Sequence, residues 1–174
     1  MAMLFIGLSF LLLLQFRIVF KKGTREIMEK GLFRKDEEQI AQDTSNQENA
    51  RQRLEELLCI NVATMDNFSI WDWEFRREGK LIAIGEYRRR FNAFDKYPDF
   101  QFSKYKFDTM KGKCAFQGIL AFMFVEFDDG FYYFPIKGNP PTQIMQRGGE
   151  LRTEEVVVIS NDSFKPTEEL KGNL

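Results

Sequence analysis

Histidine is absent from this chain of 174 residues, and cysteine occurs only twice. The absence of histidine excludes Ser-His-Asp triads, Cys-His dyads and metal sites that use imidazole ligands. Cys59 and Cys114 are far apart in the chain and form no Cys-x-x-Cys spacing. This usage fits a reducing compartment better than a disulfide scaffold, and we therefore expect a cytoplasmic protein. Any catalytic group must be a carboxylate, a lysine, an arginine, a tyrosine or water bound to a metal ion.

An excess of positive charge is also missing, because 25 Lys and Arg residues face 26 Asp and Glu residues and the net charge is −1. Binding to nucleic acid would therefore need a local basic patch. The composition is 44% hydrophobic and 15% aromatic, with 19 Phe, which is typical of a globular chain rather than a disordered one. The length suits one domain with a sizeable core.

The N-terminal segment, residues 1–22, is apolar but has no complete membrane or export signal. Its apolar run at 3–14 ends before Gln15 and Arg17, and the run is shorter than the ~20 residues of a membrane span. It also lacks a basic n-region and a small-residue cleavage site. Three interpretations stay open. The segment is a helix packed on the domain or on a partner, a membrane anchor through residues 3–20, or the product of a mis-called start.

The next segment, residues 23–45, is polar, and we predict short helices at 24–30 and 35–41 followed by a break. Ser45 has the features of an N-cap, and Glu48 follows it at the spacing of a capping box. A helix beginning there and ending near residue 60 would carry an amphipathic stripe at i, i+4, i+7 and i+8. The stripe consists of Ala50, Leu54, Leu57 and Leu58.

A β-hairpin is predicted next, with strands at 68–76 and 81–90 and a turn at Glu78-Gly79. Side chains of a strand alternate between its two faces. Each of these strands begins with apolar residues and then places an acid, Asp72 or Glu86, on the same face. Such a break in the pattern tends to mark a functional site. Two carboxylates on neighbouring strands are suitable oxygen ligands for a divalent metal ion.

The rest of the chain predicts further strands and one more helix. We expect a loop at 91–100, a helix at 103–113, a hairpin with strands at 118–127 and 131–137, a loop at 138–150 and a last strand at 156–159. The order helix, strand, strand, helix, strand, strand indicates a mixed sheet with helices packed on it, in an α/β or α+β domain. We expect this domain to span 46–163, with a tail at 164–174.

This arrangement resembles the core of the PD-(D/E)XK nuclease superfamily, the fold shared by many restriction enzymes, Holliday-junction resolvases and phage nucleases. Asp72 stands at the place of the strand aspartate, and Glu86-Tyr87-Arg88 stands at the place of the Glu-x-Lys motif. Arg90 matches the Glu-x-Lys-x-Arg variant of phage-like members. The run 106–110, Lys-Phe-Asp-Thr-Met, resembles the helix that often follows the motif. Glu48 stands at the place of the first-helix glutamate. The resemblance implies a central mixed sheet flanked by helices, a restriction-endonuclease-like core.

The resemblance also implies a function, the metal-dependent hydrolysis of phosphodiester bonds in DNA by an endonuclease or resolvase-like enzyme. By this resemblance Asp72, Glu86 and the main-chain carbonyl of Tyr87 would hold one Mg²⁺ or Mn²⁺, and Glu48 would complete the shell through water or bind a second ion. Basic residues beside the site would grip the DNA backbone. They are Arg88, Arg89, Arg90 and Lys104, with Lys106 as a further catalytic candidate. Resolvases of this fold often cut branched DNA as dimers, which suggests a homodimer, although nothing in the chain marks an interface.

Arg88 departs from the motif, which usually has lysine at this position. A guanidinium keeps the positive charge and its electrostatic role, but it cannot serve as a general base. The site could therefore work with metal-activated water alone, recruit Lys106 from the following helix, or have decayed into a module that only binds nucleic acid or protein. Plainer interpretations also exist, namely a capping box for Glu48, an ion pair for Glu86 and a solvated charge run at 88–90.

Overall fold

The computed structural model of this protein describes residues 37–66, 68–146 and 153–171. Its contacts divide the chain into two compact units, residues 1–42 and 43–174, and the fold reported below is that of the second unit. The apolar segment at 1–22 and the helix predicted at 24–30 lie outside the described residues. No described helix is long and apolar enough to cross a membrane.

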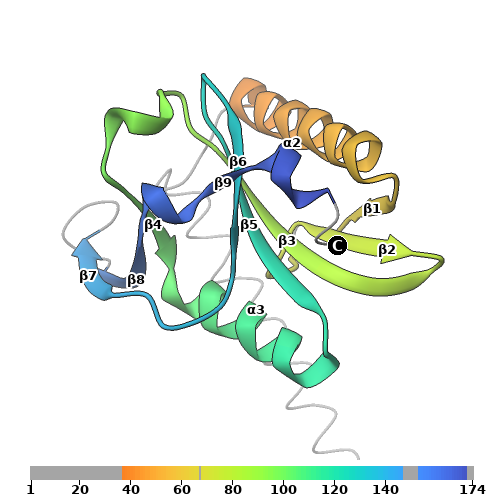
Figure 1. Ribbon diagram of the computed structural model, residues 1–174. Coiled ribbons are helices and arrows are strands. Elements are labelled where there is room, and N and C mark those ends of the chain that lie inside the picture. Colours follow the sequence, from red (N-terminus) through yellow and green to blue (C-terminus); the bar gives the residue numbers. More distant parts are fainter. Residues whose placement is uncertain (1–36, 67, 147–152, 172–174) are drawn as a thin grey trace, which may run out of the picture. The chain divides into compact units, whose positions relative to one another are not determined.

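A six-stranded mixed sheet forms the centre of the fold, in the order β1-β2-β3-β5-β6-β9 (Figure 1). Its strands are β1 Asn61–Thr64, β2 Trp73–Arg77, β3 Lys80–Arg89, β5 Leu120–Glu126, β6 Phe131–Pro135 and β9 Lys165–Pro166. Strands β3 and β5 pair in parallel, and the other neighbours in the sheet pair antiparallel. Parallel neighbours need a crossover connection, and the chain supplies it through a further strand and a helix.

That connection contributes to a second, three-stranded antiparallel sheet in the order β4-β8-β7. Its strands are β4 Asp99–Ser103, β7 Thr142–Gln146 and β8 Thr153–Ser160. The α-helices are α2 Glu37–Leu58 and α3 Lys104–Gln117. Short 3₁₀ helices are η1 Phe94–Lys96, η2 Asn161–Ser163 and η3 Thr167–Leu170.

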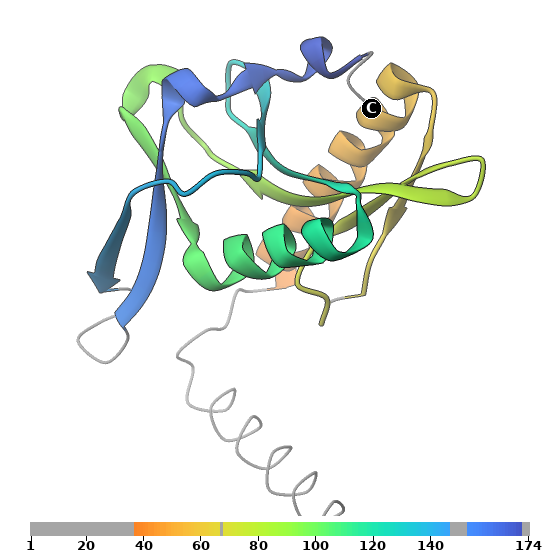
Figure 2. The ribbon, with the colours of Figure 1, turned by 60° about the horizontal axis from the view of Figure 1, so that its bottom comes forward.

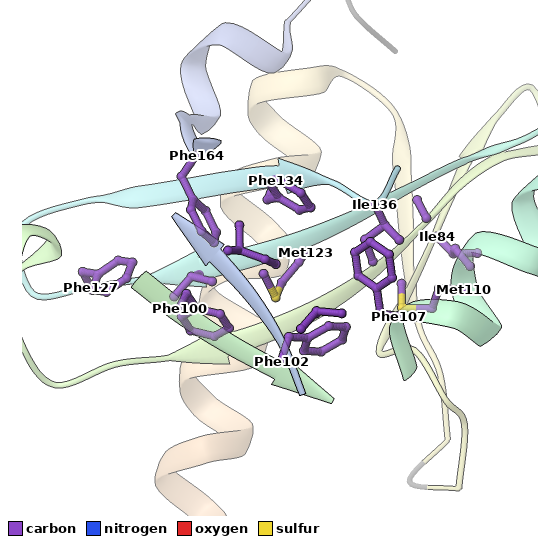
Figure 3. Packing of buried hydrophobic residues seen from close by; sticks show 14 residues of the cluster. Ile84, Phe100, Phe102, Phe107, Met110, Met123, Phe127, Phe134, Ile136 and Phe164 are labelled. Atoms are coloured by element: carbon purple, nitrogen blue, oxygen red, sulfur yellow. The ribbon is translucent and has the colours of Figure 1, made fainter. Parts of the chain in front are cut away.

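Helices α2 and α3 cover opposite faces of the large sheet (Figures 1 and 2). Ala50 and Leu54 of α2 pack into one buried cluster with aromatic residues of the sheet, among them Trp73. Phe107 and Met110 of α3 belong to the other cluster. In Figure 3 the second cluster continues from these helix residues to side chains of the small sheet. This mixed sheet with helices on both faces confirms the predicted fold class.

Strand β3 shows how the two faces are assigned. Ala83 and Tyr87 belong to the cluster on the α2 side, while Ile84 belongs to the cluster on the α3 side. Because side chains alternate along a strand, Glu86 shares the face of Ile84 and points toward α3. The turn before β3 was predicted correctly, since Glu78 and Gly79 have φ values of 52° and 77°, the left-handed pair that a tight hairpin turn requires.

The first strand of the hairpin begins later than predicted, at Trp73 rather than at residue 68. The residues before it form turns and bends. The physical reason is Asp66, whose carboxylate accepts hydrogen bonds from the Phe68 amide at 3.0 Å and the Ser69 hydroxyl at 3.0 Å. An aspartate that binds the backbone in this way favours a turn over an extended strand. Asp72 therefore lies just before β2, at its entry.

The predicted helix break and the Ser45 cap were wrong, because α2 is one helix over Glu37–Leu58 and Ser45 lies inside it. The run Asp43-Thr44-Ser45-Asn46 contains poor helix formers but neither Gly nor Pro. Each such residue costs only a few tenths of a kcal/mol, which the burial of Ala50 and Leu54 on the sheet offsets. The capping-box interpretation of Glu48 is therefore also wrong.

Several short strands escaped the sequence prediction. β4 spans the junction between the loop predicted at 91–100 and the helix predicted at 103–113, and β7 was assigned to a loop rich in Gly, Pro and Gln. β1 follows the first helix where no strand was expected, and β8 is longer than the strand predicted at 156–159. The predicted tail contributes β9 and η3, in which Leu170 is fully buried. A short edge strand has too few residues to show a clear alternation of apolar and polar side chains, so whether it forms depends on the rest of the sheet.

Candidate active site

The hairpin of β2 and β3 brings Asp72 and Glu86 together. Within it Trp73 pairs with Gly85 and Glu74 with Ile84. The chain just before β2 continues alongside β3, since the Asp72 amide donates to the Gly85 carbonyl at 2.9 Å. The Asp72 carboxylate in turn accepts from the Tyr87 amide at 2.8 Å. These two backbone contacts hold the aspartate against the strand that carries the predicted motif.

Glu86 is a fully buried carboxylate on the α3 face of the sheet, with 0% exposure. One of its oxygens, Oε1, accepts a hydrogen bond from Lys106 Nζ at 2.6 Å and forms an ion pair with the Arg88 guanidinium. The other oxygen, Oε2, is buried and has no hydrogen-bond partner in the described part of the chain. A buried charge left half-satisfied costs stability, so its presence calls for a functional reason.

The ionisation of Glu86 reflects these surroundings. Burial raises the pKa of its carboxyl group, and the nearby Asp72 carboxylate raises it further, while Arg88 and Lys106 act in the opposite direction. The two acids thus repel each other across the hairpin, and the positive charges of Arg88 and Lys106 partly compensate this repulsion. A divalent cation between the acids would relieve the same repulsion.

Tyr87, between these charges, has both its main-chain groups and its ring engaged. Its amide binds Asp72, and its carbonyl accepts from Arg88 at 3.0 Å. On the α2 side its hydroxyl donates to Glu126 at 2.7 Å, and burial raises the pKa of this hydroxyl. Arg53 of α2 binds the same carboxylate at 2.8 Å. This network anchors the middle of β3 from behind.

Glycine at position 85 allows the close packing behind the site. A Cβ atom placed there would meet the rings of Phe124 and Phe75 at 2.9 Å each. The two rings lie in the cluster on the α2 side. The site residue next to this glycine is therefore supported by aromatic packing that leaves no room for a larger side chain.

Glu48 belongs to a separate group of charges on α2. Arg51 binds its two carboxylate oxygens at 2.7 and 2.8 Å, and Gln52 donates to it at 2.8 Å. The hydrogen bond from Arg51 is the main cause that lowers the pKa of Glu48 to about 2. Arg51 also pairs with Glu55 at 2.6 Å. Within residues 37–66, 68–146 and 153–171 no three acids or cysteines gather as metal ligands, so the role of Glu48 stays a prediction.

The predicted backbone-gripping residues do not act as one row of free charges. Arg89 binds Asp128 at 2.6 Å and lies over the ring of Phe91. Lys104 pairs with Asp108 at 2.7 Å on the surface of α3. Both pairs reach the surface, where water and salt screen the attraction between the charges, so the pairs are weak and can be exchanged for phosphate. Their contact with nucleic acid stays a prediction.

The residues present fit a divalent metal ion. Asp72 and Glu86 offer carboxylate oxygens, and the unpartnered Oε2 atom of Glu86 is an acceptor for which the described residues supply no donor. The Tyr87 carbonyl is a third oxygen beside them, and Arg88 now occupies it. Mg²⁺ prefers such oxygen ligands and usually keeps several waters, so two carboxylates are sufficient.

Sequence reasoning left open whether Lys106 belongs to the site, and only the packing of α3 on β3 brings it to Glu86. It missed Asn161, which follows β8 and binds the carbonyls of Phe94 and Tyr97 at 2.6 Å each. The sequence carries no signal for these contacts, because Asn161 and its partners are more than sixty residues apart. The only local hint was its position next to Asp162 in a polar turn.

Comparisons with known proteins agree with this geometry. A model of the family described as phage putative PDDEXK endonuclease matches residues 33–166. Among solved structures, the fold is similar to that of Hjc, a Holliday junction resolvase from the archaeal hyperthermophile Archaeoglobus fulgidus, with a TM-score of 0.52 and 12% identity. The match covers 73% of this chain and 93% of Hjc. A search of curated proteins found no match. The family and the shared fold confirm the resemblance seen in the sequence.

Proposed function

Because the chain belongs to the phage putative PDDEXK endonuclease family, we propose that it hydrolyses phosphodiester bonds in DNA with the help of Mg²⁺ or Mn²⁺. The observation that carries this proposal is the buried Glu86, which lies beside Asp72, binds two cations through one oxygen and has a second oxygen for which the described residues supply no hydrogen-bond partner. A purely structural ion pair would have no need for a second acid at this place.

Asp72, Glu86 and the Tyr87 carbonyl would hold the metal ion. When bound, the ion would neutralise charge on the phosphate and lower the pKa of its water toward ~7. To receive the ion, Arg88 would leave the Tyr87 carbonyl, to which it now donates at 3.0 Å. The Arg88 side chain is 41% exposed, so it can turn toward solvent or toward a phosphate oxygen without crossing the core.

Lys106 would take the role that the motif lysine has in related nucleases. Its Nζ atom lies 2.6 Å from Glu86 Oε1, on the side of the sheet toward which this acid points. An ammonium here can orient the attacking water and stabilise the charge that develops on phosphorus-bound oxygens. In hydrolysis the water gives up a proton as its oxygen bonds to phosphorus, the bond from phosphorus to the leaving oxygen breaks, and that oxygen takes up a proton. Arg88 would add a second positive charge but no base.

The proposal is tested by incubating the purified protein with plasmid DNA and with branched DNA in the presence of Mg²⁺ or Mn²⁺. We expect cleavage that Asp72→Ala and Glu86→Ala each reduce by about 100-fold or more, since loss of the metal removes several kcal/mol of transition-state stabilisation. If the natural protein cleaves DNA no faster than these two variants, the proposal is refuted. The predicted homodimer is examined in parallel by light scattering.

The second candidate is a module that binds nucleic acid or protein without cutting it. It is favoured by the contacts of Arg88. This side chain forms an ion pair with Glu86 and donates a hydrogen bond to the Tyr87 carbonyl, and these are the groups that a metal ion would need. Calorimetric titration with Mn²⁺ separates the two candidates. An enzyme should bind Mn²⁺ in a manner that Glu86→Ala abolishes, whereas an inactive module should show no such binding.

A further inference from the structure

A cavity lies beyond the carboxyl end of β3, separate from the acids of the candidate active site. Its volume is about 440 Å³, within the range of about 300–1,000 Å³ that small-ligand sites occupy. Four aromatic rings line it, those of Phe94, Tyr97, Phe100 and Phe127. Figure 3 shows Phe100 and Phe127 at one end of the buried cluster, away from Met110 of α3.

Cations lie over aromatic rings around this cavity. The Arg90 guanidinium is 4.8 Å from the centre of the Phe100 ring, and the Lys96 ammonium is 5.5 Å from the centre of the Tyr97 ring. Tyr97 is also a large exposed ring, at 57%. Proteins that bind single-stranded nucleic acid use surfaces of this kind, in which aromatic rings stack on the bases and positive charges bind the backbone.

Polar groups of the cavity match the edges of nucleobases. Asn92, Asp99 and Gln101 are part of the lining. Amide side chains pair with adenine, and a carboxylate accepts from the amino group of cytosine. The lining holds one acid and one arginine, so the cavity itself carries no large net charge. A flat, polar-edged and neutral base suits it better than a free anion.

The loop that forms one wall of the cavity is preorganised by hydrogen bonds. Asn161 donates through Nδ2 to the carbonyls of Phe94 and Tyr97, at 2.6 Å each, and its amide donates to the Pro98 carbonyl at 3.1 Å. These bonds tie the loop that carries two of the four rings to the end of β8. A ligand would therefore not have to order this loop, which lowers the cost of binding.

The cavity also lies within reach of the same DNA strand. Arg90 lines it and follows Glu86 by four residues along an extended segment, which at ~3.3 Å per residue is about 13 Å. At 3.4 Å per nucleotide of one strand this is about four nucleotides, and fewer where the strand is stretched. A base inside a duplex cannot enter a cavity, because it is stacked and paired.

We propose that this cavity binds an unpaired base of the DNA strand near the cleaved phosphate, so that the substrate is DNA with a single-stranded arm or branch. The inference rests on the proposed nuclease function and specifies its substrate. The base stacks on Tyr97, its edge meets the polar lining, and Arg90 lies beside the backbone that leads back to Glu86.

The test measures binding without cleavage, by fluorescence anisotropy in buffer with EDTA. One labelled DNA is a duplex with an unpaired arm of about ten nucleotides, a length in the range of single-strand sites, and the other is fully paired. We expect tighter binding of the armed DNA. Tyr97→Ala should weaken armed-DNA binding by about 5- to 140-fold, since one stacked base contributes ~1–3 kcal/mol, and Tyr97→Phe should retain it. Phe116→Ala, at another exposed aromatic residue, should have no effect.

A second measurement locates the base. A single abasic site is moved along the arm, one position at a time. At one or two adjacent positions, the abasic site should weaken binding to the natural protein as much as Tyr97→Ala does. The same abasic sites should not weaken binding to the Tyr97→Ala variant any further. Arg90→Gln should also weaken armed DNA, while Arg77→Gln, beside the turn at the other end of β3, should not. Equal affinity for both DNAs, equal loss on both DNAs in Tyr97→Ala, or a flat abasic scan would overturn the inference.

These results are distinct from those of the nuclease test. Cleavage in the presence of Mg²⁺ together with a flat abasic scan would refute the cavity and leave the nuclease. A position-specific abasic effect without any cleavage would refute the nuclease and leave a base-binding cavity. Unlabelled competitors are added to the complex with the labelled armed DNA. If a peptide with an exposed aromatic residue displaces this DNA and single-stranded DNA does not, the cavity binds a protein partner and the inference is overturned.

Discussion

The pairing of Lys106 with the buried Glu86 leads to a prediction about stability that does not depend on catalysis. Lys106→Met removes one of the two cations that compensate the carboxylate, whose exposure is 0%. Hydrogen bonds to charged groups contribute ~1.5–3 kcal/mol, and a buried charge left uncompensated costs more. Since Arg88 still binds Glu86, we expect the free energy of unfolding to fall by about 1–3 kcal/mol at pH 8.

The sign of the pH dependence follows from the carboxyl group. Burial raises the pKa of Glu86, and loss of Lys106 should raise it further. A group whose pKa is higher in the folded protein than in the unfolded chain stabilises the fold below the unfolded value of about 4.5. This stability is lost as the pH rises through the folded pKa. The penalty of Lys106→Met should therefore be small near pH 4 and should grow toward pH 8.

The assay is urea unfolding in EDTA, followed through the fluorescence of the two Trp residues, for a double-mutant cycle of Lys106→Met with Glu86→Gln. In the Glu86→Gln background the penalty of Lys106→Met should fall below about 1 kcal/mol and should no longer depend on pH. Lys104→Met is the matched control, because Lys104 pairs with Asp108 on the same helix in an exposed pair worth about 0.3–0.5 kcal/mol. Equal penalties in both Glu86 backgrounds, or a penalty that does not change with pH, would refute the reasoning.

Three further predictions concern other residues of the site and its support. Arg88→Lys should keep or raise the rate of DNA cleavage, since lysine is usual at this position of the motif, and a loss of about tenfold or more in a plasmid assay would contradict this. Gly85→Ala should lower the free energy of unfolding by about 1–3 kcal/mol, because its Cβ would lie 2.9 Å from Phe75 and Phe124; a thermal unfolding temperature equal to that of the natural protein would contradict it. Glu48→Gln should cost less than about 1 kcal/mol at pH 7, since the side chain is 43% exposed. The pKa of Glu48 is lowered to about 2, so its contribution should be present above pH 4.5 and disappear as the pH falls toward 2, and unfolding curves at pH 7 and pH 2.5 that shift equally in both proteins would refute this.

The elements that the sequence predicted well are those in which local signals agree. The turn at Glu78-Gly79, strand β3 and helix α3 each combine a hydrophobic period with a turn or cap residue. The end of α3 was predicted less well, since the helix was expected to stop at residue 113 but continues to Gln117 and ends at Gly118, whose φ is 64°, as is common for a glycine after a helix. Where the local signal was weaker, as at Ser45, the packing of α2 on the sheet overrode it.

The candidate site shows the same division. The alternation of β3 is a local property, so placing Glu86 and Arg88 on one face required only the sequence. The approach of Asp72 depended on the hairpin register, which its turn sets locally. Glu48 was expected nearby because of its order in the chain, but its carboxylate is bound by Arg51 on its own helix.

The sequence by itself determined the strand that carries the motif, its acids and the absence of any imidazole chemistry, because these depend on residue identity and on a period of two. Only the tertiary structure decided which cation reaches Glu86 and how the cavity near Arg90 closes. Lys106 approaches from a helix twenty residues later, and Asn161 approaches from the end of another strand. Contacts of this kind arise when separate elements bury their apolar faces together, and no short-range pattern encodes them.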